Sequence, residues 1–208
     1  MFSVLFPGQG SQSVGMVKEL YENFDYVKDL FSQADDALNL SISKIIFNGP
    51  KEILDDTENT QPAIFLASYA IFQVIKKETS FDIDKADFFA GHSLGEYSAL
   101  ACSGVINFVD TIKLLKIRGK AMQTAVPKNE GGMVAVLGEE IKKIEKIIED
   151  NKNKFNCFIA NDNSNGQVVI SGKIQDLEKL ISELKNLNIK NIKLPVSAPF
   201  HCILMNPA

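Results

Sequence analysis

The 208-residue chain contains no tryptophan, two histidines and three cysteines. The cysteines, Cys102, Cys157 and Cys202, are widely spaced and odd in number, which fits neither a disulfide framework nor a metal-binding motif. No run approaches the roughly 18 consecutive apolar residues that a transmembrane helix requires. The apolar start of the chain is too short for a secretory signal. We therefore expect a cytoplasmic protein without a membrane segment or a bound metal.

An excess of basic residues is also missing. The net charge is −4 and the isoelectric point is near 5.3, whereas nucleic-acid-binding domains favour basic patches. This charge predicts no nucleic-acid partner. With 45% hydrophobic and 23% charged residues, the composition is typical of a globular protein. The length suffices for one substantial domain with a smaller domain inserted.

Residues 1–126 alternate short apolar runs with helical patterns. The expected elements are strands at 2–6 and 87–91 and helices at 16–38, 60–78, 94–103 and 107–124. In the helix that begins near residue 60, Thr60 is the expected N-cap, because Pro62 follows in the first turn. The alternation predicts an α/β domain with a mainly parallel sheet covered by helices.

Residues 127–197 have a different pattern. The expected order is strand, helix, two strands, helix and strand, at 131–138, 139–150, 157–162, 167–172, 174–187 and 189–196. The two middle strands flank "NSNG", a strong turn signal. This β-α-β-β-α-β order is typical of a ferredoxin-like small domain. Residues 198–208 then end in "CILMNPA" without a terminal element. We expect them to return to the large domain, whose remainder would lie beyond residue 208.

The stretch Gly91-His92-Ser93-Leu94-Gly95 matches the G-x-S-x-G nucleophile elbow, with a predicted strand before it and a predicted helix after it. In such an elbow, small flanking residues let the backbone turn sharply beneath an exposed serine hydroxyl. The Leu94 amide, at the start of the helix, can then stabilise an oxyanion. The alternative is an ordinary capped helix whose glycines only form the turn.

A nucleophilic serine needs a general base, and the two histidines limit the choice. His92 adjoins Ser93, and neighbouring side chains on such a turn diverge, so His92 is expected to line the pocket. His201 lies in a proline-containing loop after the small domain. It is either the base, if the chain returns to the large domain there, or a structural histidine. No Asp or Glu has a distinctive context for the third member of a triad.

Two further residues are candidates for substrate contacts. Arg118 lies in the otherwise apolar stretch "TIKLLKIRGKAMQ". It would bind a carboxylate through two parallel hydrogen bonds if it faced a pocket, whereas the alternative is an exposed helical arginine. The N-terminal "FPGQGSQ" is neither a P-loop nor a G-x-G-x-x-G motif. It follows a predicted strand, where open α/β sheets place ligands, and the Gln9 amide could be a second oxyanion donor.

Taken together, "FPGQGSQ", "GHSLGEYSAL", "RGKAMQ" and "SAPFHC" resemble the malonyl-CoA:acyl carrier protein transacylases of type II fatty-acid synthesis. The resemblance spans nearly the whole chain and implies an α/β-hydrolase-like large domain with an inserted ferredoxin-like domain. It implies that Ser93 takes the malonyl group from coenzyme A, that His201 is the general base, and that Arg118 binds the malonyl carboxylate.

The same resemblance implies further roles and partners. Gln9 and Leu94 would supply the oxyanion-hole amides, His92 would line the pocket, and Phe200 is typical of members that select malonyl over methylmalonyl groups. The implied substrates are malonyl-CoA and holo acyl carrier protein, with no cofactor and a monomeric enzyme. Family members continue for about a hundred residues past this point. The alternatives are a trans-acting polyketide-synthase acyltransferase, a serine esterase or thioesterase, and an inactive fragment that only binds carrier protein.

Overall fold

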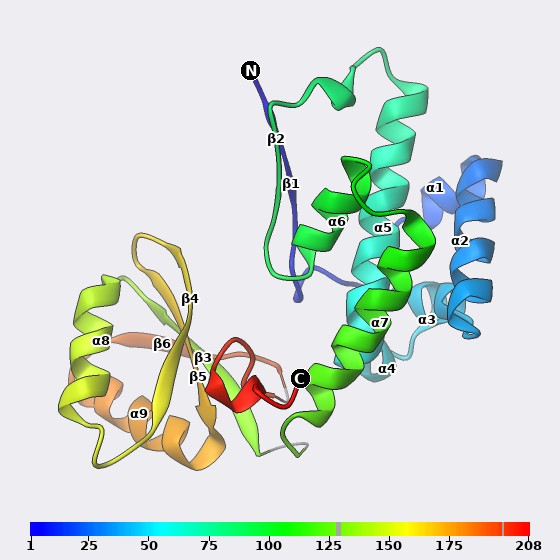
Figure 1. The fold of residues 1–208 in the computed structure, drawn as a ribbon. Helices are drawn as coiled ribbons and strands as arrows, with labels where there is room; N and C mark the ends of the chain where they lie inside the picture. The colour runs from blue at the N-terminus through cyan, green and yellow to red at the C-terminus, as the bar shows by residue number, and fades with distance from the viewer. Residues whose placement is uncertain (128–129, 197) are drawn as a thin grey trace. The chain divides into compact units, whose positions relative to one another are not determined.

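The computed structural model describes residues 1–127, 130–196 and 198–208. These residues form two compact units, Met1–Lys120 and Ala121–Ala208 (Figure 1). The division into a large domain, 1–126 with 198–208, and a small domain, 127–197, stays a prediction. The predicted small domain includes Lys128, Asn129 and Ser197, which lie outside the described part of the chain. Ser197 is also the first residue of the "SAPFHC" motif.

Unit 1 is built around a short parallel sheet. Its elements are β1 (Ser3–Phe6), α1 (Lys18–Asn23), α2 (Asp25–Leu38), α3 (Ile42–Asn48), α4 (Lys51–Asp55), α5 (Thr57–Glu78), β2 (Phe88–Gly91), α6 (Gly95–Cys102) and α7 (Phe108–Thr124), the last of which runs past Lys120. Strands β1 and β2 pair in parallel, with Phe6 opposite Gly91. Helix α6 packs on both strands. The predicted α/β class with a parallel sheet is therefore confirmed.

The helices of unit 1 differ from the prediction at three places. The predicted helix 16–38 is divided into α1 and α2 at Phe24, whose backbone is extended (φ −127°). Helices α3 and α4 were not predicted. Helix α5 begins at Thr57, so Thr60 as N-cap is wrong: the carbonyl of Asp56 accepts hydrogen bonds from the Asn59 and Thr60 amides, which starts the helix earlier.

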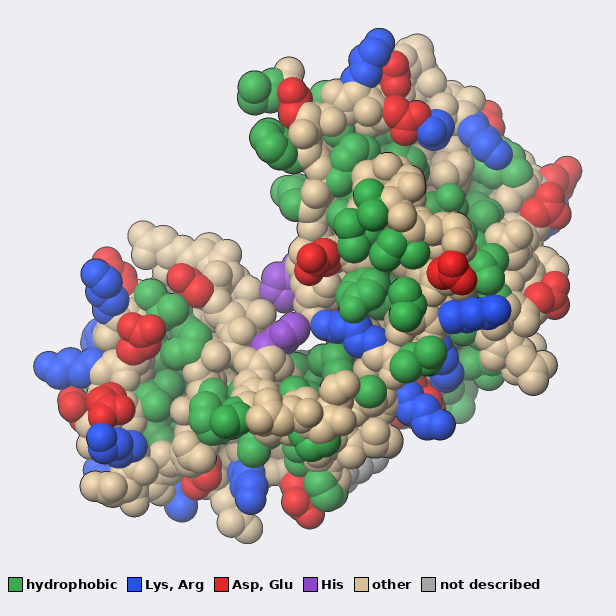
Figure 2. Space-filling view, viewed as in Figure 1, with side chains coloured by type: hydrophobic (Ala, Val, Ile, Leu, Met, Phe, Trp, Pro, Cys, Tyr) green, Lys and Arg blue, Asp and Glu red, His purple; other side chains and the backbone are tan. Residues whose placement is uncertain are grey.

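Helix α5 lies at the centre of unit 1 and is buried along most of its length. Its buried side chains share one hydrophobic core with α2, α3 and α7, including Phe31, Ile46, Phe65, Leu66 and Ile112. Hydrophobic side chains also reach the surface among the charged ones on the unit 1 face drawn in Figure 2. In the part of the chain that the structure describes, no helix combines the length and apolar character needed to cross a membrane.

Unit 2 contains an antiparallel sheet. Its elements are β3 (Gly131–Leu137), α8 (Ile141–Asp150), β4 (Cys157–Ser164), β5 (Gln167–Lys173), α9 (Ile174–Asn186) and β6 (Lys190–Lys193). The strand order is β4-β5-β3-β6, and every neighbouring pair is antiparallel. The predicted order of strands and helices is therefore found.

The two faces of the unit 2 sheet have different coverings. Helices α8 and α9 pack on the face that carries Val134, Val136 and Ile170. The opposite face carries Met133, Ala135 and Val169, and these side chains pack with Ala198 and Phe200 from the end of the chain. The C-terminal segment of unit 2 thus rests on the sheet face that the helices leave open (Figure 1).

Candidate active site

Ser93 lies in the sharp turn between β2 and α6. Its φ is +55°, in the left-handed region that non-glycine residues disfavour by about 1–2 kcal/mol. The flanking glycines make this turn possible, because a Cβ at Gly91 would lie 1.9 Å from the carbonyl carbon of Gly95. A Cβ at Gly95 would lie 2.5 Å from the carbonyl oxygen of Phe6. The turn therefore has the strained backbone of a nucleophile elbow rather than that of an ordinary capped helix.

The side chain of Arg118 reaches this serine from α7. Its Nη2 donates to Ser93 Oγ at 3.2 Å, and its Nη1 donates to Gln61 Oε1 at 2.8 Å. Helix α7 can approach α5 this closely because residue 119 is glycine; a Cβ there would lie 2.6 Å from the carbonyl oxygen of Thr57. Arg118 is half-buried, so the alternative of an exposed helical arginine is wrong.

Burial lowers the pKa of the Arg118 guanidinium below its ordinary value, and Tyr97 and Glu96 oppose that effect. The Tyr97 ring lies close, with its centroid 5.7 Å from Arg118 Cζ. Arginine remains charged at neutral pH despite such a shift. The structure therefore keeps a partly desolvated cation beside the serine hydroxyl.

The two predicted oxyanion donors lie at the ends of β1 and β2. Leu94 is the N-cap of α6, and the amides of the next three residues donate to the carbonyls of His92, Ser93 and Leu94. Helix-start amides such as that of Leu94 have no partner inside their own helix. Gln9 follows β1, and its Nε2 donates to Thr57 Oγ1 at 3.4 Å. The exposed His92 is tied to β1 through its amide, which donates to the carbonyl of Phe6.

His201 and Phe200 belong to unit 2. Phe200 is buried on the sheet, whereas His201 is exposed and has a left-handed backbone, with φ +57°. The Ser171 hydroxyl donates to the Phe200 carbonyl, and the Cys202 thiol donates to the Pro199 carbonyl at 3.1 Å. The approach of His201 to Ser93 stays a prediction.

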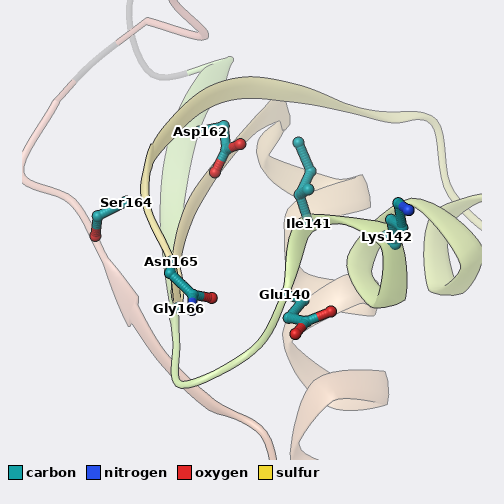
Figure 3. Close-up of a pocket in the computed structure, with 7 residues that line it drawn as sticks. All are labelled: Glu140, Ile141, Lys142, Asp162, Ser164, Asn165 and Gly166. Carbon is teal, nitrogen blue, oxygen red and sulfur yellow. The ribbon is translucent and has the colours of Figure 1, made fainter.

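A separate hollow of about 360 Å³ lies in unit 2, where the β4–β5 hairpin faces the start of α8 (Figure 3). It is lined by residues of both charges, including Glu140, Lys142 and Asp162, and it contains none of the predicted site residues. Across the described ranges, which omit 128–129 and 197, no three His, Cys, Asp or Glu side chains are grouped closely enough to hold a metal ion.

Comparison with known proteins decides the family. Residues 4–208 match the acyl transferase domain family. The chain belongs to this family. It is 43% identical, over its whole length, to the malonyl CoA-acyl carrier protein transacylase of Salmonella typhimurium, and it spans 66% of that relative. The stretch that matches the family includes the elbow at Ser93.

Solved structures of acyltransferases have the same fold. An acyl-carrier-protein-S-malonyltransferase from Bartonella henselae superposes with a TM-score of 0.93 at 44% identity, covering 100% of this chain and 67% of that one. A malonyl-transacylase bound to a type II PKS acyl-carrier protein superposes with a TM-score of 0.92 at 40% identity, covering 99% of this chain and 66% of that one.

Three residues of the site region, Gln61, Tyr97 and Ser171, were not predicted from the sequence. Gln61 is 1% exposed in α5, and its oxygen holds the acyltransferase's Arg118. A buried amide needs a hydrogen-bond partner, so the available signal was the polar side chain of Gln61 at the edge of the apolar run that begins at Pro62. Tyr97 and Ser171 had no comparable signal, because both belong to regular patterns of their elements.

Proposed function

We propose that this acyltransferase moves the malonyl group of malonyl-CoA to the phosphopantetheine thiol of acyl carrier protein in fatty-acid synthesis. The observation that carries the proposal is the 3.2 Å contact between Arg118 Nη2 and Ser93 Oγ at a strained elbow. A nucleophile and a cation this close suit an acyl group that ends in a carboxylate. The named relatives support the same choice.

Ser93 is the proposed nucleophile. Its Oγ forms a bond to the thioester carbon while His201 takes the hydroxyl proton. The negative charge that develops on the carbonyl oxygen is stabilised by the Gln9 and Leu94 amides. The carbon–sulfur bond then breaks, and His201 gives the proton to the coenzyme A thiolate. The carrier protein's thiol reverses these steps on the malonyl-serine.

Arg118 is the proposed selectivity residue. Its partners Gln61 and Ser93 are uncharged, so neither supplies the negative charge that a malonyl carboxylate brings. Gln61 also holds one side of the guanidinium, which limits the orientations available to the other side. In the proposed pocket His92 is a lining residue, and Phe200 favours malonyl over methylmalonyl groups.

The domain assignment belongs to the same proposal. The strand order β4-β5-β3-β6, antiparallel throughout, supports a ferredoxin-like small domain at 127–197. The parallel pairing of β1 with β2 and the elbow support an α/β-hydrolase-like large domain at 1–126, continued by 198–208. We further propose a monomeric, cytoplasmic enzyme that needs no cofactor beyond its coenzyme A thioester.

The decisive experiment is intact-mass spectrometry after mixing the protein with malonyl-CoA or acetyl-CoA. We expect a malonyl-sized adduct, a weaker acetyl adduct, and no adduct on Ser93→Ala. Arg118→Gln should slow malonylation by about 100-fold and leave acetylation nearly unchanged, because hydrogen bonds to charged groups contribute about 1.5–3 kcal/mol each.

Lys116→Gln is the matched control. It removes a charge two residues away on the same helix, where Lys116 contacts Asn59 and Glu58 rather than Ser93. This variant should malonylate at the wild-type rate. A folded protein that forms no adduct with either thioester would contradict the proposal and favour a fragment that only binds carrier protein. Hydrolysis of simple esters faster than transfer would favour a serine esterase or thioesterase.

A second candidate function differs only in the carrier. The superposed malonyl-transacylase in complex with a type II PKS acyl-carrier protein makes a polyketide carrier a specific alternative. Offering the malonyl-enzyme an equimolar mixture of a fatty-acid and a polyketide carrier protein tests this alternative. The carrier that becomes malonylated first is the preferred partner.

A further inference from the structure

The segment that ends at His201 is seated on the open face of the unit 2 sheet. Ala198 and Phe200 are 0% and 5% exposed, and they pack with Met122, Met133 and Val169. His201 itself is exposed. The sheet therefore holds the residues before the histidine and leaves the histidine at the surface.

Ser171 adds a hydrogen bond to the apolar contacts between this segment and the sheet. It lies on β5 two residues after Val169, so both side chains project from the same face of the sheet. Ser171 is 0% exposed, and its hydroxyl donates to the carbonyl oxygen of Phe200 at 2.5 Å. The Phe200 carbonyl and the His201 amide belong to one planar peptide unit. A hydrogen bond to that carbonyl consequently fixes the orientation of the peptide plane that precedes the His201 Cα.

The backbone of His201 requires such support. Its φ of +57° lies in the left-handed region, where a non-glycine residue stays only if its surroundings hold it. A second contact comes from the neighbouring strand β3, where a Cβ at Gly131 would lie 2.2 Å from Pro199 Cδ. Ser171 and Gly131 therefore hold the residues immediately before His201 from two adjacent strands.

We propose that Ser171 is a positioning residue, which sets the orientation of His201 through the Phe200 carbonyl. This inference rests on the proposed role of His201 as general base. It predicts that the step needing the base depends on a buried hydroxyl that touches neither substrate. Binding of the malonyl carboxylate, which the proposal assigns to Arg118, should not depend on Ser171.

The test is rapid-quench measurement of Ser93 malonylation in the full chain. For Ser171→Ala we expect the maximal rate constant to fall about tenfold, the value of one lost hydrogen bond. The half-saturating malonyl-CoA concentration should stay within about twofold of wild type, because the hydrogen bond from Ser171 to Phe200 does not contribute to the binding of malonyl-CoA. The fraction of molecules that become acylated should be unchanged. A merely structural role would lower that fraction and leave the rate constant of the folded molecules intact.

Two glycine variants provide a matched pair. Gly131→Ala places a methyl group against Pro199 and should slow malonylation as Ser171→Ala does. Gly132→Ala changes the next residue of the same strand, but its Cβ would meet Leu177 Cδ1 at an ordinary 3.4 Å on the helix-covered face. This variant should malonylate at the wild-type rate.

A wild-type rate constant in Ser171→Ala would overturn the positioning role and leave the proposed function intact. Equal slowing by Gly131→Ala and Gly132→Ala would also overturn it, because the effect would then be a general one of strand substitution. A His201→Ala variant that malonylates normally would instead overturn the assignment of the base, and the positioning role with it. These outcomes separate failure of the inference from failure of the proposed function.

Discussion

The backbone of Ser93 adopts a left-handed conformation that residues with a Cβ disfavour. A left-handed serine is unfavourable, yet the contacts of Gly91 with Gly95, and of Gly95 with Phe6, leave the chain no wider turn. The strain lifts the hydroxyl out of β2 toward Arg118. Reactivity and stability therefore oppose each other at this residue, as they often do at strained functional sites.

This conflict predicts different stabilities for two inactive variants. Glycine adopts φ +55° without the steric cost that alanine bears, so Ser93→Gly should unfold with a free energy about 1 kcal/mol higher than Ser93→Ala. Both variants lack the hydroxyl and its hydrogen bond to Arg118, so the loss of this bond does not contribute to the difference between them. Urea unfolding of the two proteins measures the difference. Equal midpoints with equal slopes would show that the turn is not strained.

At the scale of elements, the junction of α4 and α5 supports the site. Thr60 is fully buried, and its hydroxyl donates to the carbonyl of Leu54 at 2.6 Å. That carbonyl lies in the last turn of α4, where carbonyls have no partner within their helix. The bond joins the two helices one residue before Gln61, which holds Arg118.

Replacing Thr60 with valine should therefore destabilise the protein. The shape is nearly kept, but the Leu54 carbonyl loses its donor in a buried place, which costs about 1–2 kcal/mol of unfolding free energy. Thr111→Val is the matched control: Thr111 is equally buried, but its hydroxyl donates to the Asn107 carbonyl, which also accepts the Thr111 amide. Thermal unfolding should show a clearly larger loss for Thr60→Val, and equal losses would contradict this account.

The sequence predicted elements best where a motif marked one of their ends. Pro7 follows β1, Gly91 ends β2, and the elbow marks the start of α6, so these elements were found nearly at their observed bounds. Helices α3 and α4 were missed because they are short, with seven and five residues, whereas helical periodicity is recognised over a window of about 11–18 residues. The break at Phe24 was missed because neither glycine nor proline marks it.

The site was predictable only in part for a related reason. Spacing alone indicated Ser93, since strand, turn and helix follow each other along the chain. Arg118 was ambiguous, because whether a helical arginine is exposed depends on the helix that packs against it. Gln61 and Ser171 act through contacts across 57 and 29 residues of sequence, and no local pattern encodes such contacts.

At the scale of the whole molecule, each unit contains a buried thiol. Burial raises the pKa of Cys102 in unit 1 and of Cys157 in unit 2 from 9.0 to about 12. The folded protein therefore keeps both thiols protonated at a pH where the unfolded chain ionises them. Between pH 9 and 12 the unfolded state binds fewer protons than the folded one, so the stability present below pH 9 is lost as the pH rises.

The expected slope is about 1 kcal/mol of unfolding free energy per pH unit for each thiol in this range. Urea unfolding at pH 8 and pH 10.5 measures it, and Cys102→Ala should show a shallower decline than wild type. At pH 8 neither buried thiol should react with iodoacetamide until the protein unfolds. Parallel declines for the wild type and Cys102→Ala would contradict the assignment to this thiol.

The elbow also ties the appearance of a reactive serine to the progress of folding. Its geometry depends on the contact of Gly95 with Phe6 and on the pairing of Phe6 with Gly91, two ends of a long loop. Closing that loop costs entropy and delays the contact relative to the local helices. A nascent chain that has formed α2 and α5 thus still presents an inert hydroxyl. The rate at which Ser93 becomes reactive toward a serine-directed probe during refolding would therefore report the rate at which β1 pairs with β2.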